Sequence, residues 1–567
     1  MRGPRALVAS AAVLAIYSAA FAAMPPGAFY SPDEGTKYLQ LRSIGWRDGI
    51  AYAVPYGGAA LDPDYAYYPT HCRHQDLYPI PLPGGGVRFH WPIWFSLITS
   101  LPAELFGLRG LYVIPLLSGW LTALLCGRLA AMYDRRLAPL AIVAAGLATP
   151  LAFFSLTYWE HTLAALLGIG AVTLIAARSQ HAATAWLAST LLVAAVCLRL
   201  ELVPFALAIA LAWWLARRAT ASGGAHAVRR ARGWLAAYAI AIAGALLAAS
   251  AFMPFRHAWV LSELHLYALG ALAKLPHLAG ALVATLIDAR GHSAPDLPAW
   301  LRAGALVAFA AAAAAAFLRP ARFAAAVAVF ATLAALTFSA LVALLPAPYM
   351  SVHGLLPVAP FVILAAWAVP EAIHGGQFDR LFLAYATGLY AVLGFALLFT
   401  FTFDAGGAYR TGLEWGNRYL LLLYPLGAVL ALAGFQSWRR AAGEKLGAIA
   451  TAIAVGLVLC GLQMEARGLW VLYRSRALVA EWQAALTGEP VVTDVWWLPA
   501  AMAPYFADRP MFCVRDRAEL AAWMDSAHGR GADAFTVATF RDLAPPTRVG
   551  APFAVVDVGR VPVTGLR

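Results

Sequence analysis

The chain contains 567 residues, of which 62% are hydrophobic and 12% are charged, whereas soluble globular domains carry about 25% charged residues. Together with a mean hydropathy of +0.69, this composition excludes a soluble globular enzyme and predicts a helical membrane protein. The net charge of +12 comes mainly from arginine. In a membrane protein such an excess indicates which loops face the cytoplasm rather than nucleic-acid binding.

The first predicted element is a membrane span over residues 6–24, since a spanning helix needs about 20 mostly apolar residues. Arg2 and Arg5 precede it, and the positive-inside bias therefore places the N-terminus in the cytoplasm and residue 25 onward outside. Small residues near the end of the span leave a cleaved signal peptide as the alternative. We interpret residues 91–106 as an interfacial or re-entrant helix, so the first external loop covers 25–108.

Twelve further spans follow in this interpretation, which brings the total to thirteen. They are expected near 109–131, 138–157, 162–177, 183–198, 202–216, 233–254, 301–317, 323–346, 354–371, 381–403, 418–436 and 446–464. The basic segments then fall on the cytoplasmic side, as the positive-inside bias requires. These segments are 135–136, 178, 217–232, 319–322, 380 and 439–445.

The C-terminal segment, 465–567, is predicted to form a small external α/β domain. Its β-rich runs at 490–497, 535–540 and 553–558 alternate with helical stretches, one of them over 517–528. The predicted fold class is therefore an all-α polytopic membrane bundle over 1–464 with a small C-terminal soluble α/β domain. Cys72 and Cys513 both fall on the external side, which leaves a disulfide between them open.

Two adjacent carboxylates, Asp33 and Glu34, follow the first span in the sequence Ser-Pro-Asp-Glu-Gly. They lie at the height of the outer lipid headgroups, where a carboxylate can deprotonate an acceptor hydroxyl or bind a cation. The alternative is a solvated turn in which both acids only cap the helix expected over 35–44.

The first external loop also supplies basic side chains that suit a phosphate. They are Lys37, Arg73, His74, Arg88 and His90. His71, Cys72 and His74 could ligate zinc, but the sequence offers no second pair of ligands at a recognised spacing. No cofactor is therefore certain, and a divalent cation is left open.

Later outer loops add further charged residues. Glu160 and His161 form a turn with Tyr158 and Trp159 between two apolar spans, at the same membrane height as Asp33. The alternative here is an interfacial aromatic belt with a solvated glutamate. Such a belt would leave the acid without a chemical role.

Arg199 and Glu201 flank another outer helix end, where an i,i+2 pair does not face itself on a helix. We expect them to reach neighbouring helices or a lipid headgroup. The last outer loop contains Arg410 and Arg418, and Arg418 opens a span from the outside. A planar guanidinium can hold a phosphate with two hydrogen bonds. The alternative is an arginine that snorkels to the interface.

These segments resemble bacterial GT-C glycosyltransferases, relatives of the lipid A aminoarabinose transferase and of protein mannosyltransferases. The resemblance is carried by Ser-Pro-Asp33-Glu34, by Tyr-Trp-Glu160-His161 and by Glu414-Trp-Gly-Asn-Arg418-Tyr-Leu, together with thirteen spans and an external tail. It implies that Asp33 is the catalytic base and Glu34 its partner, with Glu160 and His161 as a second acidic site.

The resemblance also implies the reaction. A hexosyl or pentosyl group would pass, with inversion, from a polyprenyl-phosphate-sugar donor to a hydroxyl of a cell-envelope acceptor, which is a glycan, a lipid or a protein. Arginine would meet the charge of the departing phosphate. The expected partners are the donor, the acceptor and the bilayer, without nucleic acid. The expected location is the inner membrane, with the C-terminal domain outside.

Two other classes of protein stay open at this point. An O-antigen ligase or polymerase-like enzyme is also polytopic, but its basic catalytic loop normally lies between late spans. A transporter should have broken helices or ionisable residues at mid-membrane depth. Most charges in this sequence fall instead at the ends of the predicted spans.

Overall fold

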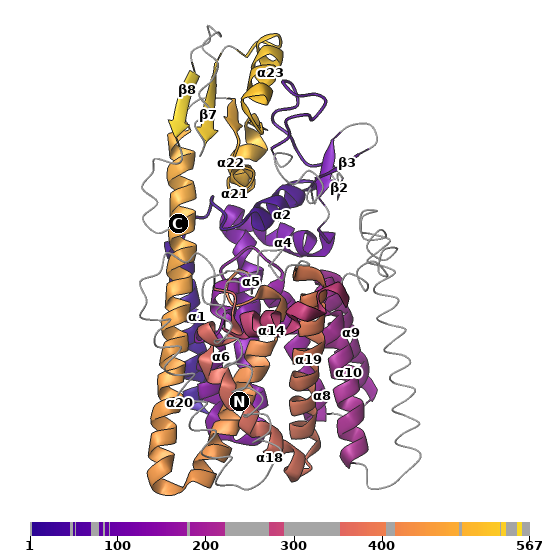
Figure 1. Ribbon diagram of the computed structural model, residues 1–567, viewed down its shortest axis with the longest axis vertical. Helices are drawn as coiled ribbons and strands as arrows, with labels where there is room; N and C mark the ends of the chain where they lie inside the picture. Colours follow the sequence, from indigo (N-terminus) through magenta and orange to yellow (C-terminus); the bar gives the residue numbers. More distant parts are fainter. Residues whose placement is uncertain are drawn as a thin grey trace.

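The structure is a computed structural model of the chain. It describes residues 3–45, 49–50, 53–69, 79–82, 86–89, 91–178, 182–220, 272–287, 352–403, 414–486, 490–532, 534–539 and 553–557. The described chain is mostly helical: long helices stand side by side as a bundle, and a small sheet lies beyond one end of it (Figure 1). The predicted combination of a helical bundle with a small C-terminal sheet is thus present.

Within the described residues, five helical stretches are long and apolar enough to cross a membrane. They are Pro4–Ala23, Ile93–Tyr133, Leu200–Thr220, Phe378–Phe401 and Gly447–Ala485. The spans expected at 233–254, 301–317 and 323–346 lie outside the described residues. The total of thirteen spans therefore stays a prediction.

The bundle is built from α1 (Pro4–Ala23), α5 (Val113–Tyr133), α6 (Ala138–Leu147), α7 (Leu151–Phe154), α8 (His161–Arg178), α9 (Ala182–Leu198), α10 (Val203–Thr220), α14 (Leu278–Ile287), α17 (Leu355–Val358), α18 (Ala368–Gly375), α19 (Phe378–Thr402) and α20 (Leu423–Ala485). Short 3-10 helices join some of them, namely η1 (Gly107–Tyr112), η2 (Arg135–Leu137), η3 (Leu200–Leu202), η4 (Leu275–His277), η6 (Pro360–Trp367) and η7 (Arg418–Leu420). The bounds of four predicted spans agree closely with those of α8, α9, α10 and α19.

Two predicted spans are broken in the structure. The stretch 138–157 divides into α6 and α7 next to Pro150, and 354–371 divides into α17, η6 and α18 next to Pro357 and Pro360. Proline lacks the backbone N–H that a helix interior requires and clashes with the preceding turn. The hydropathy of these two stretches therefore predicts that they are buried, but it does not predict where their helices break.

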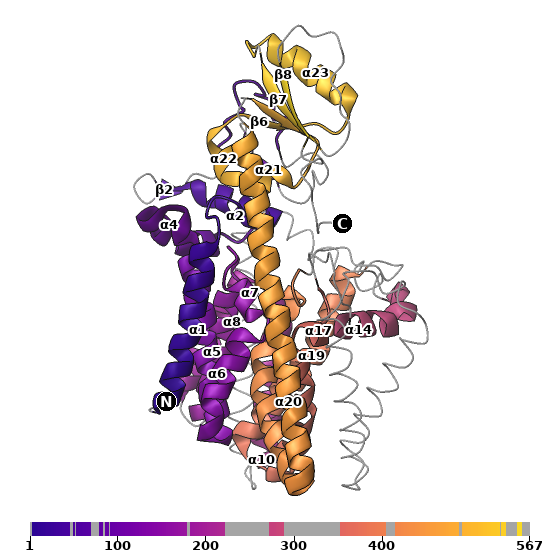
Figure 2. The same ribbon diagram turned by 90° about the vertical axis from the view of Figure 1, so that its left-hand side faces the viewer.

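The segment predicted as an interfacial helix is α4 (Ile93–Phe106), which lies with α2 (Pro32–Arg42) across the end of the bundle (Figures 1 and 2). Gly107 has a φ of +61°, in the left-handed region that favours glycine. A Cβ on Gly110 would lie 1.9 Å from the carbonyl oxygen of Pro102. The chain thus turns back on itself between α4 and α5 rather than continuing as one straight helix.

α20 covers two predicted spans and doubles back between them. A straight helix of its 63 residues would be about 95 Å long, yet Gly427 lies against Val362 and Gly461 lies against Phe361. The two arms therefore stand side by side, with the turn at the far end of the bundle from the sheet (Figure 1). The second arm runs on to Ala485, so the boundary expected near 465 falls inside a helix.

The C-terminal region contains a parallel sheet in the order β6-β5-β7-β8. Its strands are β5 (Val491–Thr493), β6 (Met511–Cys513), β7 (Phe535–Thr539) and β8 (Phe553–Asp557), and its helices are α21 (Leu498–Ala501), α22 (Ala503–Asp508) and α23 (Arg517–His528). Trp523 of α23 packs on Phe512 and Phe535. Cys513 is disulfide-bonded, while Cys72 lies outside the described residues. Their pairing stays a prediction.

Two short hairpins follow α2: β1 (Ile44–Gly45) with β2 (Gly49–Ile50), and β3 (Pro79–Pro81) with β4 (Val87–Phe89). The C-terminal region docks directly on α2. A Cβ on Gly35 would lie 1.6 Å from the carbonyl oxygen of Ala500 in α21, and the Phe29 N–H donates to the Ala501 carbonyl. α2 is therefore held between the bundle and the sheet (Figure 2).

Candidate functional site

The predicted acidic pair lies in the first turn of α2, which begins with a capping box. The Ser31 hydroxyl accepts from the Glu34 N–H, and the Glu34 carboxylate accepts from the Ser31 N–H at 3.1 Å. Pro32 occupies the first helical position, where its missing N–H costs nothing. This local sequence fixes the start of the helix and the direction of both acids.

Glu34 is wholly buried and is surrounded by donors. One oxygen accepts from the backbone N–H groups of Tyr30 and Ser31. The other accepts from the Tyr158 N–H at 2.6 Å and from Arg476 at 3.1 Å. Because both oxygens are occupied by protein groups, Glu34 is suited to positioning rather than to the catalytic partnership expected from the sequence.

Asp33 has a different environment on the same turn. Its Oδ2 lies 2.6 Å from Nη1 of Arg418, and the two side chains are each about 10% exposed. Lys37 lies one helical turn further along α2, on the same face. Asp33 therefore meets a guanidinium from the far end of the chain at a partly accessible position.

Glu160 bridges two cations. Its Oε2 lies 2.6 Å from Lys37 Nζ, and its Oε1 lies 2.8 Å from Arg199 Nη1. Burial raises the pKa of Glu160, but Lys37 and Arg199 outweigh burial, and the pKa lies below its usual value. Burial lowers the pKa of Lys37, which Glu160 offsets only in part. The alternative interpretation of an aromatic belt with a solvated acid does not hold for Glu160, which is 4% exposed.

Arg199 connects Glu160 to two further groups. It donates to Nδ1 of His161 at 3.1 Å and pairs with Glu201. The sequence argument that Arg199 and Glu201 do not face each other is wrong. It assumed a helix through both residues, whereas Arg199 is extended, with φ −146° and ψ 107°.

Aromatic side chains line the charged groups. Lys37 Nζ lies 4.5 Å from the ring centre of Trp91, and the Arg418 guanidinium lies 5.1 Å from that of Trp159. Tyr419 lies within 6 Å of both Arg199 and Arg418. Ring faces attract cations, so these contacts help to hold the three cationic side chains in place. We call Asp33, Lys37, Glu160, Arg199 and Arg418 the charged cluster.

The loop that carries Arg418 is anchored by Trp415. This buried side chain stacks on Phe153 and donates to Glu465 of α20 at 3.2 Å. A Cβ on Gly468 would lie 2.6 Å from the indole ring, so the glycine makes room for it. Glu414, Gly416 and Asn417 have φ between +54° and +67°. Glu414 and Asn417 are not glycine, so the backbone is strained at these two positions. The surrounding tertiary structure has to hold the backbone in this conformation.

Glu414 is a further acid beside the charged cluster. Burial raises its pKa above the usual value, and Arg418 opposes the shift only in part. Its side chain is hydrogen-bonded to Tyr30, which precedes the α2 capping box. Glu414 belongs to the sequence segment that resembles the family, but the sequence pattern alone indicates no role for its side chain.

The remaining expected site residues fall into two groups. Arg73, His74, His90 and Arg410 lie outside the described residues. Arg88 lies in β4, and within the described part of the chain it forms no ion pair with the cluster. In the part of the chain that the structure describes, no group of three or more His, Cys, Asp or Glu side chains is placed to hold a metal ion.

Arg476 was missed in the sequence. It belongs to the segment 465–567, for which the sequence predicts an external α/β domain, and in the structure it lies on the second arm of α20 and is 0% exposed. Besides Glu34 it contacts the Leu156 carbonyl and the ring of Tyr112. A helical pattern continued beyond residue 464 would have placed this arginine on a buried helix face.

The cluster combines two chemical capacities. Lys37, Arg199 and Arg418 present cationic donors that can bind an anion such as a phosphate. Asp33 is a carboxylate within reach of the same anion, and it can accept a proton when Arg418 turns to a ligand. Anion binding and proton transfer can therefore occur side by side.

Neither a protein-family model nor a curated protein matches the sequence. Among solved structures, the chain is similar to the apo oligosaccharyltransferase of Archaeoglobus fulgidus, with 13% identity over 88% of this chain and a TM-score of 0.43. The match spans 64% of that chain. The chain is also similar to ArnT from Cupriavidus metallidurans in the apo state, with 14% identity over 92% of this chain and 88% of that chain and a TM-score of 0.36.

The same ArnT bound to undecaprenyl phosphate gives 16% identity over the same shares of the two chains, with a TM-score of 0.33. These structural neighbours are GT-C glycosyltransferases, the class that the sequence resembles. At such identities and at TM-scores below 0.5, the chemistry of this chain has to be inferred from its own residues.

Proposed function

We propose that this chain is a membrane glycosyltransferase. In this proposal it moves a sugar from a polyprenyl-phosphate-linked donor to a hydroxyl of a cell-envelope acceptor, on the external side of the inner membrane. The proposed membrane part, 1–464, and the proposed external domain, 465–567, meet within the second arm of α20, which continues to Ala485. The observation that carries the proposal is the ion pair of Asp33 with Arg418 beside the Lys37–Glu160–Arg199 bridge.

The proposed mechanism assigns the donor phosphate to Arg418, Lys37 and Arg199. Phosphate binding draws Arg418 away from Asp33, which leaves this carboxylate available as a base. The acceptor oxygen then bonds to the anomeric carbon, and Asp33 takes its proton. The bond between that carbon and the phosphate oxygen breaks, and polyprenyl phosphate leaves with the electron pair. Its charge is stabilised by the same cations.

Glu160 and Glu34 have supporting roles in this proposal. Glu160 holds Lys37 and Arg199 at a fixed separation, through contacts of 2.6 and 2.8 Å. Glu34 fixes the start of α2 and thereby the direction of Asp33. Such pre-positioned charges reorganise little during the reaction, which is a main source of enzymatic rate acceleration.

The proposal is tested by donor turnover. Purified full-length protein in lipid nanodiscs would be incubated with a panel of radiolabelled undecaprenyl-phosphate sugars and a cell-envelope extract. We expect one of these donors to release undecaprenyl phosphate and to label a component of the extract. The absence of turnover with every donor, from protein that binds undecaprenyl phosphate, would contradict the proposed transfer.

A further inference from the structure

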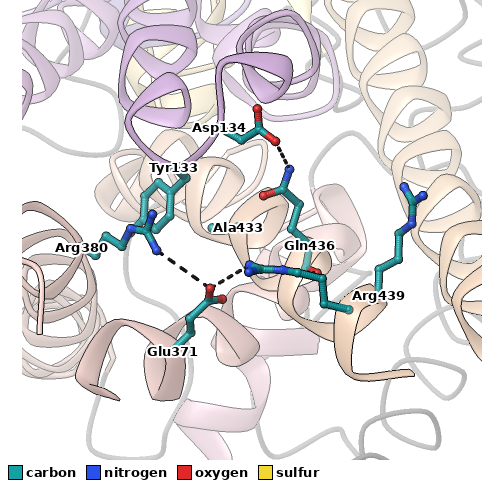
Figure 3. A pocket seen from close by; sticks show the side chains of 8 residues that line it. Tyr133, Asp134, Glu371, Arg380, Ala433, Gln436 and Arg439 are labelled. Atoms are coloured by element: carbon teal, nitrogen blue, oxygen red, sulfur yellow. Dashed lines mark hydrogen bonds and ion pairs between the residues drawn. The ribbon is translucent and has the colours of Figure 1, made fainter. Parts of the chain in front are cut away.

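A polar pocket of about 420 Å³ is lined partly by α18 (Figure 3). α18 lies at the opposite end of the bundle from α2, which carries Asp33 and Lys37 of the charged cluster (Figure 1). It is formed where α5, α18, α19 and the first arm of α20 meet. Its polar lining consists of Tyr133, Asp134, Glu371, Arg380, Gln436, Arg439 and Arg440. None of these residues takes part in the proposed transfer reaction.

The carboxylates of the pocket already have partners. Asp134 accepts from Gln436 at 3.0 Å and from the Arg136 N–H at 2.8 Å. Glu371 lies 2.8 Å from Arg440 and 3.9 Å from Arg380. Three guanidinium groups against two carboxylates leave one net positive charge in the pocket.

Part of the donor capacity of the arginines is unused. Within the described ranges, Arg439 forms no ion pair or hydrogen bond, and the buried Nε of Arg380 has no hydrogen-bond partner. Arg440 is held at Glu371 while its side chain stays 68% exposed. The pocket is thus built to accept one more anionic group, and guanidinium forks fit the oxygens of a phosphate.

The pocket lies at the membrane boundary opposite the charged cluster. The apolar stretch Leu200–Thr220 begins next to Arg199 of the cluster and ends near Arg217, whose guanidinium lies 4.7 Å from the ring centre of Phe378. Phe378 in turn begins the apolar stretch that continues to Phe401. The length of one membrane span therefore separates the pocket from the cluster.

We propose that this pocket binds the phosphate of an anionic phospholipid from the inner leaflet. Arg439 and Arg440 hold the phosphate oxygens, and Arg380 contributes from behind. Basic pockets between membrane helices on the cytoplasmic side are suited to such headgroups, and juxtamembrane arginines are attracted to the anionic surface of that leaflet. The bound lipid ties the turn of α20 to α18 and α19.

The test compares lipid retention by two variants of equal charge. Full-length protein, purified in detergent, would be titrated with dioleoylphosphatidylglycerol or dioleoylphosphatidylcholine and examined by native mass spectrometry. The pocket variant is Arg439→Gln with Arg440→Gln. The control variant is Arg135→Gln with Arg136→Gln, which removes the same charge from exposed residues at the same end, outside the pocket lining.

We expect wild type and the control variant to retain phosphatidylglycerol in preference to phosphatidylcholine. The pocket variant should bind phosphatidylglycerol about thirtyfold more weakly, since each basic residue at an anionic surface contributes about fivefold. An equal loss in both variants would overturn the proposal, because it would indicate a diffuse surface effect. Displacement of the lipid by millimolar inorganic phosphate would also overturn it, in favour of a site for a soluble phosphate.

Discussion

Arg418 Nη1 lies 2.6 Å from Oδ2 of Asp33, although 385 positions separate the two residues in the chain. The contact joins the first turn after the first span to the loop before the last two arms of the bundle. A charged pair at this depth is costly unless both partners are held in place. The Trp415 anchor and the α2 capping box provide that restraint, and the pair is the centre of the proposed chemistry.

The buried Arg476–Glu34 pair should be important for stability. Arg476→Gln leaves the Glu34 carboxylate buried without its cation, which typically costs about 3–5 kcal/mol. The measurement is thermal unfolding of the purified protein in detergent. Arg515→Gln is the control, because its partner Glu519 forms an exposed i,i+4 pair of the kind that contributes at most about 1 kcal/mol. Equal losses in Tm would contradict the positioning role of Glu34.

Gly416→Ala should disturb the loop that carries Arg418. A Cβ there would lie 2.4 Å from Pro150 Cγ, at a φ of +67°. Gly376→Ala is the matched control, since its φ is +61° but a Cβ would meet nothing within 4 Å. Both variants should lose about 1 kcal/mol from the left-handed backbone. Only Gly416→Ala should lower the rate of donor turnover in addition, by about tenfold or more. Similar turnover in the two variants would show that the geometry of this loop is unimportant.

Glu414 should make stability fall with rising pH. Its pKa in the folded protein lies above the usual 4.5, because burial disfavours the charged form. The unfolded chain then loses its proton at lower pH than the folded protein, so stability declines as pH rises from about 4.5 through the folded pKa. Glu414→Gln removes this loss. The Tm of the variant relative to wild type should be higher at pH 8 than at pH 5, and a constant difference would contradict the pKa assignment.

Glu160 should behave in the opposite way. Lys37 and Arg199 overcome the effect of burial and keep its folded pKa below the usual value. Its contribution to stability is therefore present above the unfolded pKa and is lost as pH falls through the folded pKa. Glu160→Gln should lower Tm most at pH 7, and the deficit should shrink below about pH 4. A deficit that persists unchanged at low pH would show that packing, rather than charge, is what Glu160 provides.

Much of the bundle could be predicted because its helices are apolar stretches bounded by charge. α8, for example, was expected over 162–177 and is observed from His161 to Arg178. The C-terminal helix over 517–528 was likewise confirmed. In these segments the pattern of apolar and charged residues indicates where each helix begins and ends.

Other features depended on contacts that no local pattern contains. The partner of Asp33 is far away in sequence, and Arg476 takes part only because the second arm of α20 continues past residue 464. Strand β6 over 511–513 was missed, since three buried residues give no alternation. Local sequence patterns therefore indicate individual charged residues but not the pairs that they form in the structure.

In the proposed reaction, Asp33 removes the proton while Arg418 binds the phosphate. The most direct test is steady-state turnover of the identified polyprenyl-phosphate sugar by Asp33→Asn and Arg418→Gln, with Tm checked for both variants. Asp33→Asn should lower kcat by about a hundredfold or more with little change in KM for the donor, whereas Arg418→Gln should also raise that KM. Turnover by Asp33→Asn at the wild-type rate would contradict the account.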